Sequence, residues 1–165
     1  GRLGDARLAL AVFRGQAALD ATAFARVRER LERPQPRVAL GLALRGLAHA
    51  AADVSDGLRG DLGHILAASG LGATLNADAL LACCDPDLRA QGPAVALDFA
   101  LHGGDDYELV FTASPDRREA IARAAQAVAL PVTRIGRTSA EPGLRVLDTQ
   151  GQPLAVAGRG FDHFA

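Results

Sequence analysis

The stretch at residues 50–58 reads Ala50-Ala51-Ala52-Asp53-Val54-Ser55-Asp56-Gly57-Leu58. Its first five residues are mostly short and apolar, so they form either a buried strand or the end of the preceding helix. A helix then begins at the Ser-Asp-Gly turn and runs to residue 69, because Leu58, Leu62 and Leu66 recur at helical spacing. The stretch therefore predicts an apolar segment that leads through a polar turn into a helix.

Helical and strand patterns alternate on both sides of this stretch. Apolar spacing and turn residues predict helices over residues 20–33, 37–49, 93–101 and 114–130, and strands over 73–76, 106–112, 132–137, 144–147 and 154–156. A turn at residues 148–152 joins the last two strands into a hairpin. This alternation predicts an α+β fold, with a mixed β-sheet layered with helices.

Length, charge and cysteine usage limit the classes of protein that fit. The 165 residues predict one domain over 1–165, and the net charge of −1 with a pI near 6.5 excludes the basic stripe of a nucleic-acid partner. No apolar run reaches the roughly 18–20 residues of a membrane helix, and no secretion signal opens the chain. Cys83 and Cys84 are adjacent, too close for an unstrained disulfide, so we expect a reducing, cytoplasmic location.

The chain contains no lysine, since all 18 basic residues are arginine. A Walker A phosphate loop needs Gly-Lys-[Ser/Thr], so this loop is excluded. A lysine Schiff base is excluded for the same reason. Any phosphate chemistry must therefore depend on arginine, on backbone N–H groups or on a metal ion.

The polar turn has the residue types of a magnesium–phosphate site. Asp53 and Asp56 stand three residues apart at the entry to a helix, with Ser55 between them. A helix N-terminus attracts phosphate, and Mg²⁺ prefers oxygen ligands that it shares with substrate phosphates. The alternative is structural, with Ser55 or Asp56 acting only as a helix N-cap.

Two further segments carry clustered polar and aromatic residues. The first reads His102-Gly103-Gly104-Asp105-Asp106-Tyr107-Glu108, and the second reads Gly158-Arg159-Gly160-Phe161-Asp162-His163-Phe164. Glycines let the backbone approach a ligand closely, acids bind a metal or a cationic ring, and an aromatic side chain stacks on a ring. The alternatives are a loop of solvated acids with a packed Tyr107, and a C-terminal tail pinned by its phenylalanines.

Together the three segments resemble the C-terminal half of the thiamine-monophosphate kinase family, which is related to AIR synthase. That family reads approximately Asp-hydrophobic-Ser-Asp-Gly-Leu, Gly-Gly-Glu-Asp-Tyr-Glu-Leu and Gly-Tyr-Asp-His-Phe, and this chain matches it at residues 53–58, 103–109 and 160–164. The resemblance spans nearly the whole chain and implies a fold like the AIR synthase C-terminal domain. It also implies that residues 1–33 are a connecting helical segment from an N-terminal ATP-binding domain.

The resemblance implies transfer of the γ-phosphate of ATP to thiamine monophosphate, giving thiamine diphosphate, with Mg²⁺ and a homodimeric intact protein. Asp53 and Asp56 match Mg²⁺ ligands, Ser55 matches an ATP contact, and Asp105 and Phe161 match substrate-binding positions. No residue of this chain is assigned a catalytic role. The family usually has Glu at the position of Asp105 and Tyr at that of Phe161, so a methylene and a hydroxyl are missing here.

Three functions stay open at this point. The chain is the C-terminal domain of such a kinase and is inactive alone, because the N-terminal domain supplies further metal ligands. Alternatively it is a non-catalytic binding or assembly module on the same fold. A sister enzyme such as aminoimidazole ribonucleotide synthetase or selenophosphate synthetase is the third option, against which the second and third segments favour the thiamine branch.

Overall fold

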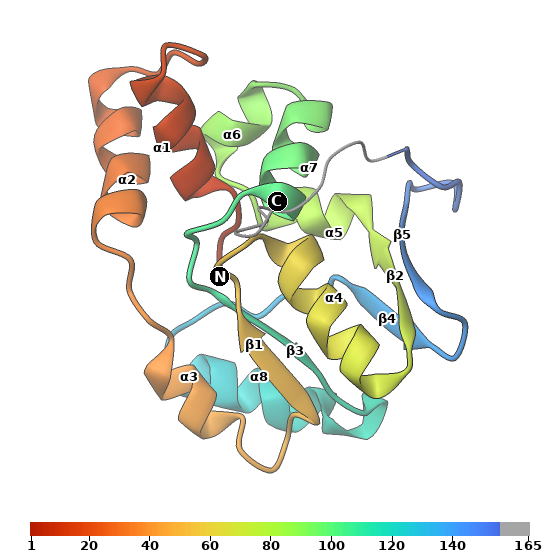
Figure 1. Cartoon of the computed structure of the whole chain (residues 1–165). Helices are drawn as coiled ribbons and strands as arrows, with labels where there is room; N and C mark the ends of the chain where they lie inside the picture. The colour runs from red at the N-terminus through yellow and green to blue at the C-terminus, as the bar shows by residue number, and fades with distance from the viewer. Residues whose placement is uncertain (156–165) are drawn as a thin grey trace.

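The computed structural model describes residues 1–155 and contains two small β-sheets with one long helix between them (Figure 1). The strands β1 (Ala50–Asp53) and β3 (Leu109–Thr112) form an antiparallel pair. The other sheet has the order β4-β2-β5, with β2 (Gly72–Asn76) antiparallel to β4 (Gly136–Ser139) and parallel to β5 (Gly143–Leu147). Helix α4 (Leu58–Ser69) contacts β1, β2 and β3, so it joins the two sheets.

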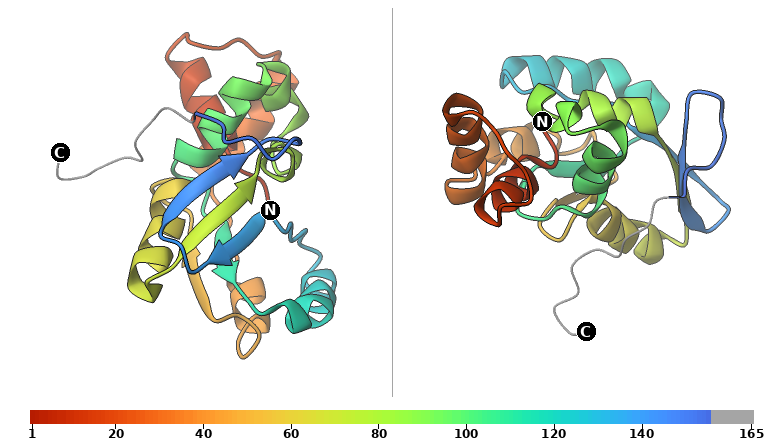
Figure 2. Two further views of the ribbon diagram at one scale, coloured as in Figure 1. Left: turned by 90° about the vertical axis from the view of Figure 1, so that its right-hand side faces the viewer. Right: turned by 90° about the horizontal axis from the view of Figure 1, so that it is seen from above.

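Two pairs of helices lie at opposite ends of the molecule, and α5, α6 and α7 lie between them. Short α3 and α8 lie together beside the β1–β3 pair, while α1 and α2 pack on each other at the opposite end (Figure 1). In Figure 2 the three strands of the larger sheet lie side by side, with β2 in the middle. The bounds are α1 Asp5–Phe13, α2 Ala21–Glu32, α3 Val38–Ala43, α5 Ala77–Ala82, α6 Pro86–Ala90, α7 Pro93–His102, the 3-10 turn η1 Pro115–Arg117, and α8 Arg118–Ala127.

The predicted α+β class is confirmed, and residues 50–53 are a strand rather than the end of a helix. The helix predicted over 37–49 was too long, because it ends at residue 43 and Gly46 has a φ of +74° in the turn that follows. The strand predicted over 106–112 begins only at residue 109. Asp105 and Tyr107 have φ values of 64° and 50°, which an extended strand does not allow.

The predicted arrangement of the last strands was also partly wrong. The strand predicted over 132–137 forms instead at Gly136–Ser139, as β4. Strands β4 and β5 lie on opposite edges of β2 and do not pair with each other. The turn at 148–152 is confirmed, since the Asp148 carboxylate accepts the N–H groups of Gln150 and Gln152. Beyond that turn Pro153 forms an isolated antiparallel bridge with Leu147, and the strand predicted over 154–156 extends past the described residues, which end at 155.

Two hydrophobic clusters hold these elements together. The larger one includes the fully buried side chains of Leu8, Leu58, Leu80, Leu88 and Leu101, and so joins α1 to α4, α5, α6 and α7. The smaller one joins Leu40 of α3 and the C-cap residue Leu44 to Ile121 of α8, under Leu109 and Phe111 of β3. Because strand residues alternate between faces, Val110 of β3 packs in the larger cluster. The β1–β3 pair therefore separates the two clusters.

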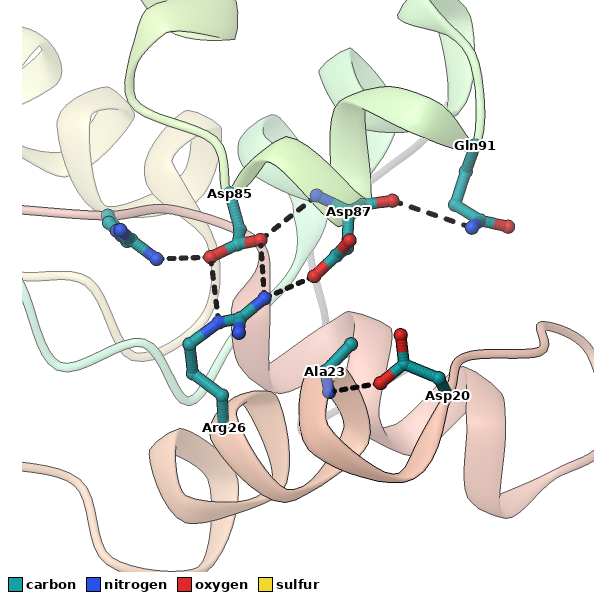
Figure 3. A network of polar contacts seen from close by, with 7 residues as sticks. Asp20, Ala23, Arg26, Asp85, Asp87 and Gln91 are labelled. Carbon is teal, nitrogen blue, oxygen red and sulfur yellow. Dashed lines mark hydrogen bonds and ion pairs between the residues drawn. The ribbon is translucent and has the colours of Figure 1, made fainter.

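Ion pairs tie α2 to α6 at the other end of the molecule (Figure 3). The guanidinium of Arg26 lies between the carboxylates of Asp85 and Asp87, and Arg2 also pairs with Asp85. Asp85 is buried, and its carboxylate accepts the N–H of Asp87 as well. Asp20 caps α2 by accepting the N–H of Ala23 at 2.8 Å, as its position before the helix favours. Along residues 1–155 no helix combines the length and apolarity that a membrane crossing requires.

The two faces of α3 give a matched test of this packing. Leu40 is 3% exposed and Leu42 is 60% exposed. We expect Leu40→Ala to lower the free energy of unfolding by about 2–5 kcal/mol, because it leaves a cavity against α8. Leu42→Ala should change it by less than about 0.5 kcal/mol. Urea unfolding of both variants measures this, and equal losses would show that α3 does not pack as described.

Candidate functional site

The turn between β1 and α4 carries three of the predicted site residues. Asp53 ends β1 and is exposed, while Ser55 and Asp56 are half-buried in the turn itself. Gly57 is the N-cap of α4, with a φ of +103° and no side-chain cap bond. A Cβ at Gly57 would lie 3.0 Å from the carbonyl oxygen of Leu101, so the turn requires glycine. The N-cap position predicted for Ser55 or Asp56 in the structural alternative is therefore occupied by Gly57.

Asp61, in the first turn of α4, holds this turn from inside. Its side chain is buried, and one carboxylate oxygen, Oδ2, accepts the N–H of Ser55 at 3.0 Å and that of Asp56 at 3.1 Å. Burial raises the pKa of the Asp61 carboxyl, the two N–H bonds oppose that rise, and the carboxylates of Asp56 and Asp53 add to it. Sequence reasoning missed this role. An acid early in the helix is the available signal, because such acids often reach back to preceding N–H groups.

The glycine-rich loop lies directly against the same turn, although about 50 residues separate them in the sequence. The N–H of Asp105 donates to the carbonyl oxygen of Ser55 at 3.0 Å, and that of Tyr107 donates to the carbonyl of Val54 at 2.9 Å. A Cβ on Gly104 would lie 2.3 Å from the Ser55 oxygen, so only glycine allows this approach. The tertiary structure therefore brings Asp105 beside the turn that carries Asp53, Ser55 and Asp56.

Two acids of the loop, Asp106 and Glu108, point into the protein. Asp106 is buried and accepts the N–H of Gly4 at 2.6 Å. Glu108 is also buried and accepts hydrogen bonds of 2.7 Å from both Arg30 and Arg37. Burial raises the pKa of Glu108, but the hydrogen bonds from Arg37 and from the Arg2 N–H, together with the charges of the N-terminus and Arg37, outweigh it and hold that pKa below its usual value. The alternative in which these loop acids are merely solvated is therefore wrong for both residues.

Asp105, which precedes these two buried acids, is exposed, and Tyr107, which lies between them, is partly exposed; both have left-handed backbone conformations. Such φ values are strained for non-glycine residues and concentrate at functional sites. The Tyr107 hydroxyl lies 3.5 Å from Oδ1 of Asp105, whose charge raises the pKa of the phenol, as do the charges of Asp53 and Asp56 more weakly. The turn and the loop therefore share one negative field, which attracts a metal cation or a positively charged ring.

The donors in this field suit a cation that brings other ligands with it. Among the residues described, 1–155, no three His, Cys, Asp or Glu side chains come together to hold a metal ion. Mg²⁺ is usually bound by one or two carboxylates, with water and substrate phosphates completing its shell. Asp53 and Asp56 match that requirement in number and in donor type. The remaining predicted residue, Phe161, lies outside the described residues, as does its whole C-terminal segment.

The two sheets, the helix between them and the acidic turn that opens it define an α+β domain of the AIR synthase class. The sequence matches the family described as AIR synthase related protein, C-terminal domain, over residues 5–149, and the chain belongs to that family.

Relatives of known name and structure agree with this family. The thiamine-monophosphate kinase of Salmonella typhimurium is 46% identical over 134 residues, which are 81% of this chain and 41% of that protein. The crystal structure of thiamine-monophosphate kinase from Stenotrophomonas maltophilia K279a superposes with a TM-score of 0.81 at 47% identity, covering 88% of this chain and 48% of that one. The structure of AaThiL complexed with AMPPCP and TMP has a TM-score of 0.76 at 26% identity, over 99% and 49%. The chain thus spans about half the length of the relatives it matches.

The buried acids near the loop make stability depend on pH. Burial raises the pKa of Asp5 to about 6 and that of Asp106 to about 7; the charge of Asp85 adds to the rise at Asp5, and the charge of Asp5 adds to the rise at Asp106. The folded protein therefore holds protons that the unfolded chain releases. This contribution is complete below pH 4, where the unfolded carboxyls are protonated, and is lost as the pH rises through 6 and 7.

We therefore expect the free energy of unfolding to fall between pH 5 and pH 8, by on the order of a few kcal/mol. Asp5→Asn removes one of the two charges at nearly constant volume and should flatten this dependence. Urea unfolding at successive pH values measures both proteins. A free energy that rises with pH across this window, in the unsubstituted protein, would contradict the assignment.

Proposed function

We propose that this chain is the C-terminal part of a kinase that transfers the γ-phosphate of ATP to thiamine monophosphate, giving thiamine diphosphate. The observation that carries the proposal is the hydrogen bond from Asp105 N–H to Ser55 carbonyl, which puts the expected metal turn and the expected substrate loop side by side. The 46–47% identity to named thiamine-monophosphate kinases supports it. So does the likeness to AaThiL complexed with AMPPCP and TMP.

In this proposal Asp53 and Asp56 hold Mg²⁺, and Ser55 contacts ATP. When bound, Mg²⁺ neutralises negative charge on the phosphates that react. The exposed position of Asp53, at the open end of β1, leaves its carboxylate accessible to a metal–nucleotide complex. Phosphoryl transfer depends mainly on positioning and on charge neutralisation, so the absence of lysine from the chain is no obstacle.

Asp105 contacts the substrate in this proposal, together with Phe161 from the C-terminal segment. The exposed carboxylate of Asp105 contributes to the negative field of the turn and loop, and in this proposal it attracts the positively charged thiazolium ring of thiamine monophosphate. Phe161 supplies an aromatic face for the same ring. Asp105 is one methylene shorter than the Glu usual in the family, so the ring must approach the loop more closely.

The rest of the intact protein completes the active site in this proposal. Because the chain spans about half of its relatives, we propose that a preceding ATP-binding domain supplies further metal ligands, and that residues 1–33 connect to it. We further propose that residues 1–165 form one domain, that the intact protein is a homodimer, and that it works in the cytoplasm. The two buried free cysteines fit a reducing compartment.

The first test compares the isolated chain with the full-length protein. Given Mg²⁺, ATP and thiamine monophosphate, only the full-length protein should form thiamine diphosphate, because the chain alone holds one pair of metal ligands. Chromatographic detection of thiamine diphosphate measures the turnover. Robust turnover by the isolated chain would contradict the shared active site, and no turnover by the full-length protein would overturn the kinase proposal in favour of a binding module.

The second test removes the charge of one proposed metal ligand. Asp53→Asn in the full-length protein should lower turnover at least about tenfold and raise the Mg²⁺ concentration needed, with little change in the melting temperature. Asp78→Asn, which changes an exposed carboxylate in the first turn of α5, is the matched control. Turnover of Asp53→Asn that matches this control at every Mg²⁺ concentration would show that Asp53 is not a ligand.

A further inference from the structure

The hydrogen bonds of Asp61 do not pair the free N–H groups at the start of its own helix, α4. The N–H groups left unpaired at the start of α4 belong to the helix's first residues, from Leu58 onward. The Asp61 carboxylate instead accepts the N–H groups of Ser55 and Asp56, which precede the N-cap Gly57. Its side chain therefore acts on the turn before the helix rather than on the helix itself.

The same turn carries the contact to the glycine-rich loop. The N–H of Ser55 is held by Asp61, and the carbonyl oxygen of Ser55 accepts the N–H of Asp105 at 3.0 Å. One residue therefore links the buried carboxylate on one side to the exposed loop on the other. A shift of the Ser55 backbone would move Asp53 and Asp56 on one side and Asp105 on the other.

We propose that Asp61 is a positioning residue of the phosphotransfer site, which fixes the backbone of Ser55 and Asp56 and thereby the spacing between Asp53, Asp56 and Asp105. The effect of Asp61 on catalysis depends on the proposed function. Its effect on the backbone depends only on the hydrogen bonds described above. Because the Asp61 side chain is buried, it contacts neither nucleotide nor substrate. Two N–H groups bound to one buried oxygen leave the turn little freedom, which suits a turn that must hold its shape when a ligand leaves.

Two substitutions separate the hydrogen bonds of Asp61 from its charge. Both N–H groups donate to a single oxygen, Oδ2, so the amide oxygen of Asp61→Asn can accept both bonds without the charge. Asp61→Ala removes the acceptor altogether. Asp20→Ala is the control, because Asp20 likewise accepts a backbone N–H at the start of a helix, but on α2.

The experiment uses the full-length protein and three measurements. Hydrogen exchange reports on the Ser55 and Asp56 amides, calorimetry with Mg²⁺ alone reports metal affinity, and steady-state kinetics separate kcat from the KM for thiamine monophosphate. We expect Asp61→Ala to speed exchange at those two amides, weaken Mg²⁺ binding and lower kcat, each at least about tenfold, and to raise the KM. Asp61→Asn should stay within about threefold of the unsubstituted protein, and Asp20→Ala should change none of the site measurements.

Several results would overturn the proposal. One is an alanine variant with unchanged exchange at both amides or unchanged Mg²⁺ affinity. Another is an asparagine variant that keeps the amides protected yet loses activity as severely as alanine does, since the charge would then be responsible. If Asp61→Ala does not fold, Asp61→Ser replaces it with the same expected pattern, because a serine hydroxyl is too short to reach both amides. An unsubstituted protein without kinase activity would defeat the proposed function alone, since the exchange and Mg²⁺ measurements would still decide the role of Asp61.

Discussion

Buried carboxylates that accept backbone N–H groups hold this domain in its shape. Asp61 fixes the turn before α4, Asp85 accepts the N–H at the start of α6, and Asp106 anchors the start of α1. A buried carboxylate is costly unless hydrogen bonds and opposite charges compensate it. Each of these acids therefore specifies one arrangement of the chain around it, and the hydrophobic clusters fill the space that the arrangement leaves.

The exposed site depends on this buried framework. Asp105 and Tyr107 hold left-handed backbone conformations that short polar loops do not keep unaided. Their neighbours Asp106 and Glu108 are buried and bound to the N-terminal segment, through Gly4, Arg30 and Arg37. The contacts of the buried Asp106 and Glu108 therefore compensate the backbone strain of the exposed residues beside them. In the proposed kinase, this would couple the segment leading in from a preceding domain to the position of the substrate.

Much of the fold could be predicted from local patterns. The helices α2, α4 and α7 agree with their predicted ranges to within one residue at most ends, because apolar spacing, an Asp cap and a proline mark them. Predictions failed where a conformation depends on distant residues. The strand expected from residue 106 starts later because Asp106 and Glu108 contact the N-terminal segment, and β5 pairs along its whole length with β2, which is distant in the sequence.

For the site, residue types and spacing indicated the pair Asp53 and Asp56 and the acids of the glycine-rich loop, since acids at a helix entry and beside paired glycines have recognisable chemistry. The resemblance to a known family was needed to single out Ser55 and Asp105. The sequence did not indicate that these two segments lie close together in space. Residues 53–57 and 103–108 come together through main-chain hydrogen bonds and through glycines that admit a close approach, and neither leaves a pattern linking distant positions. The role of Asp61 was hidden for the same reason, because burial and hydrogen-bond partners exist only once the chain has folded.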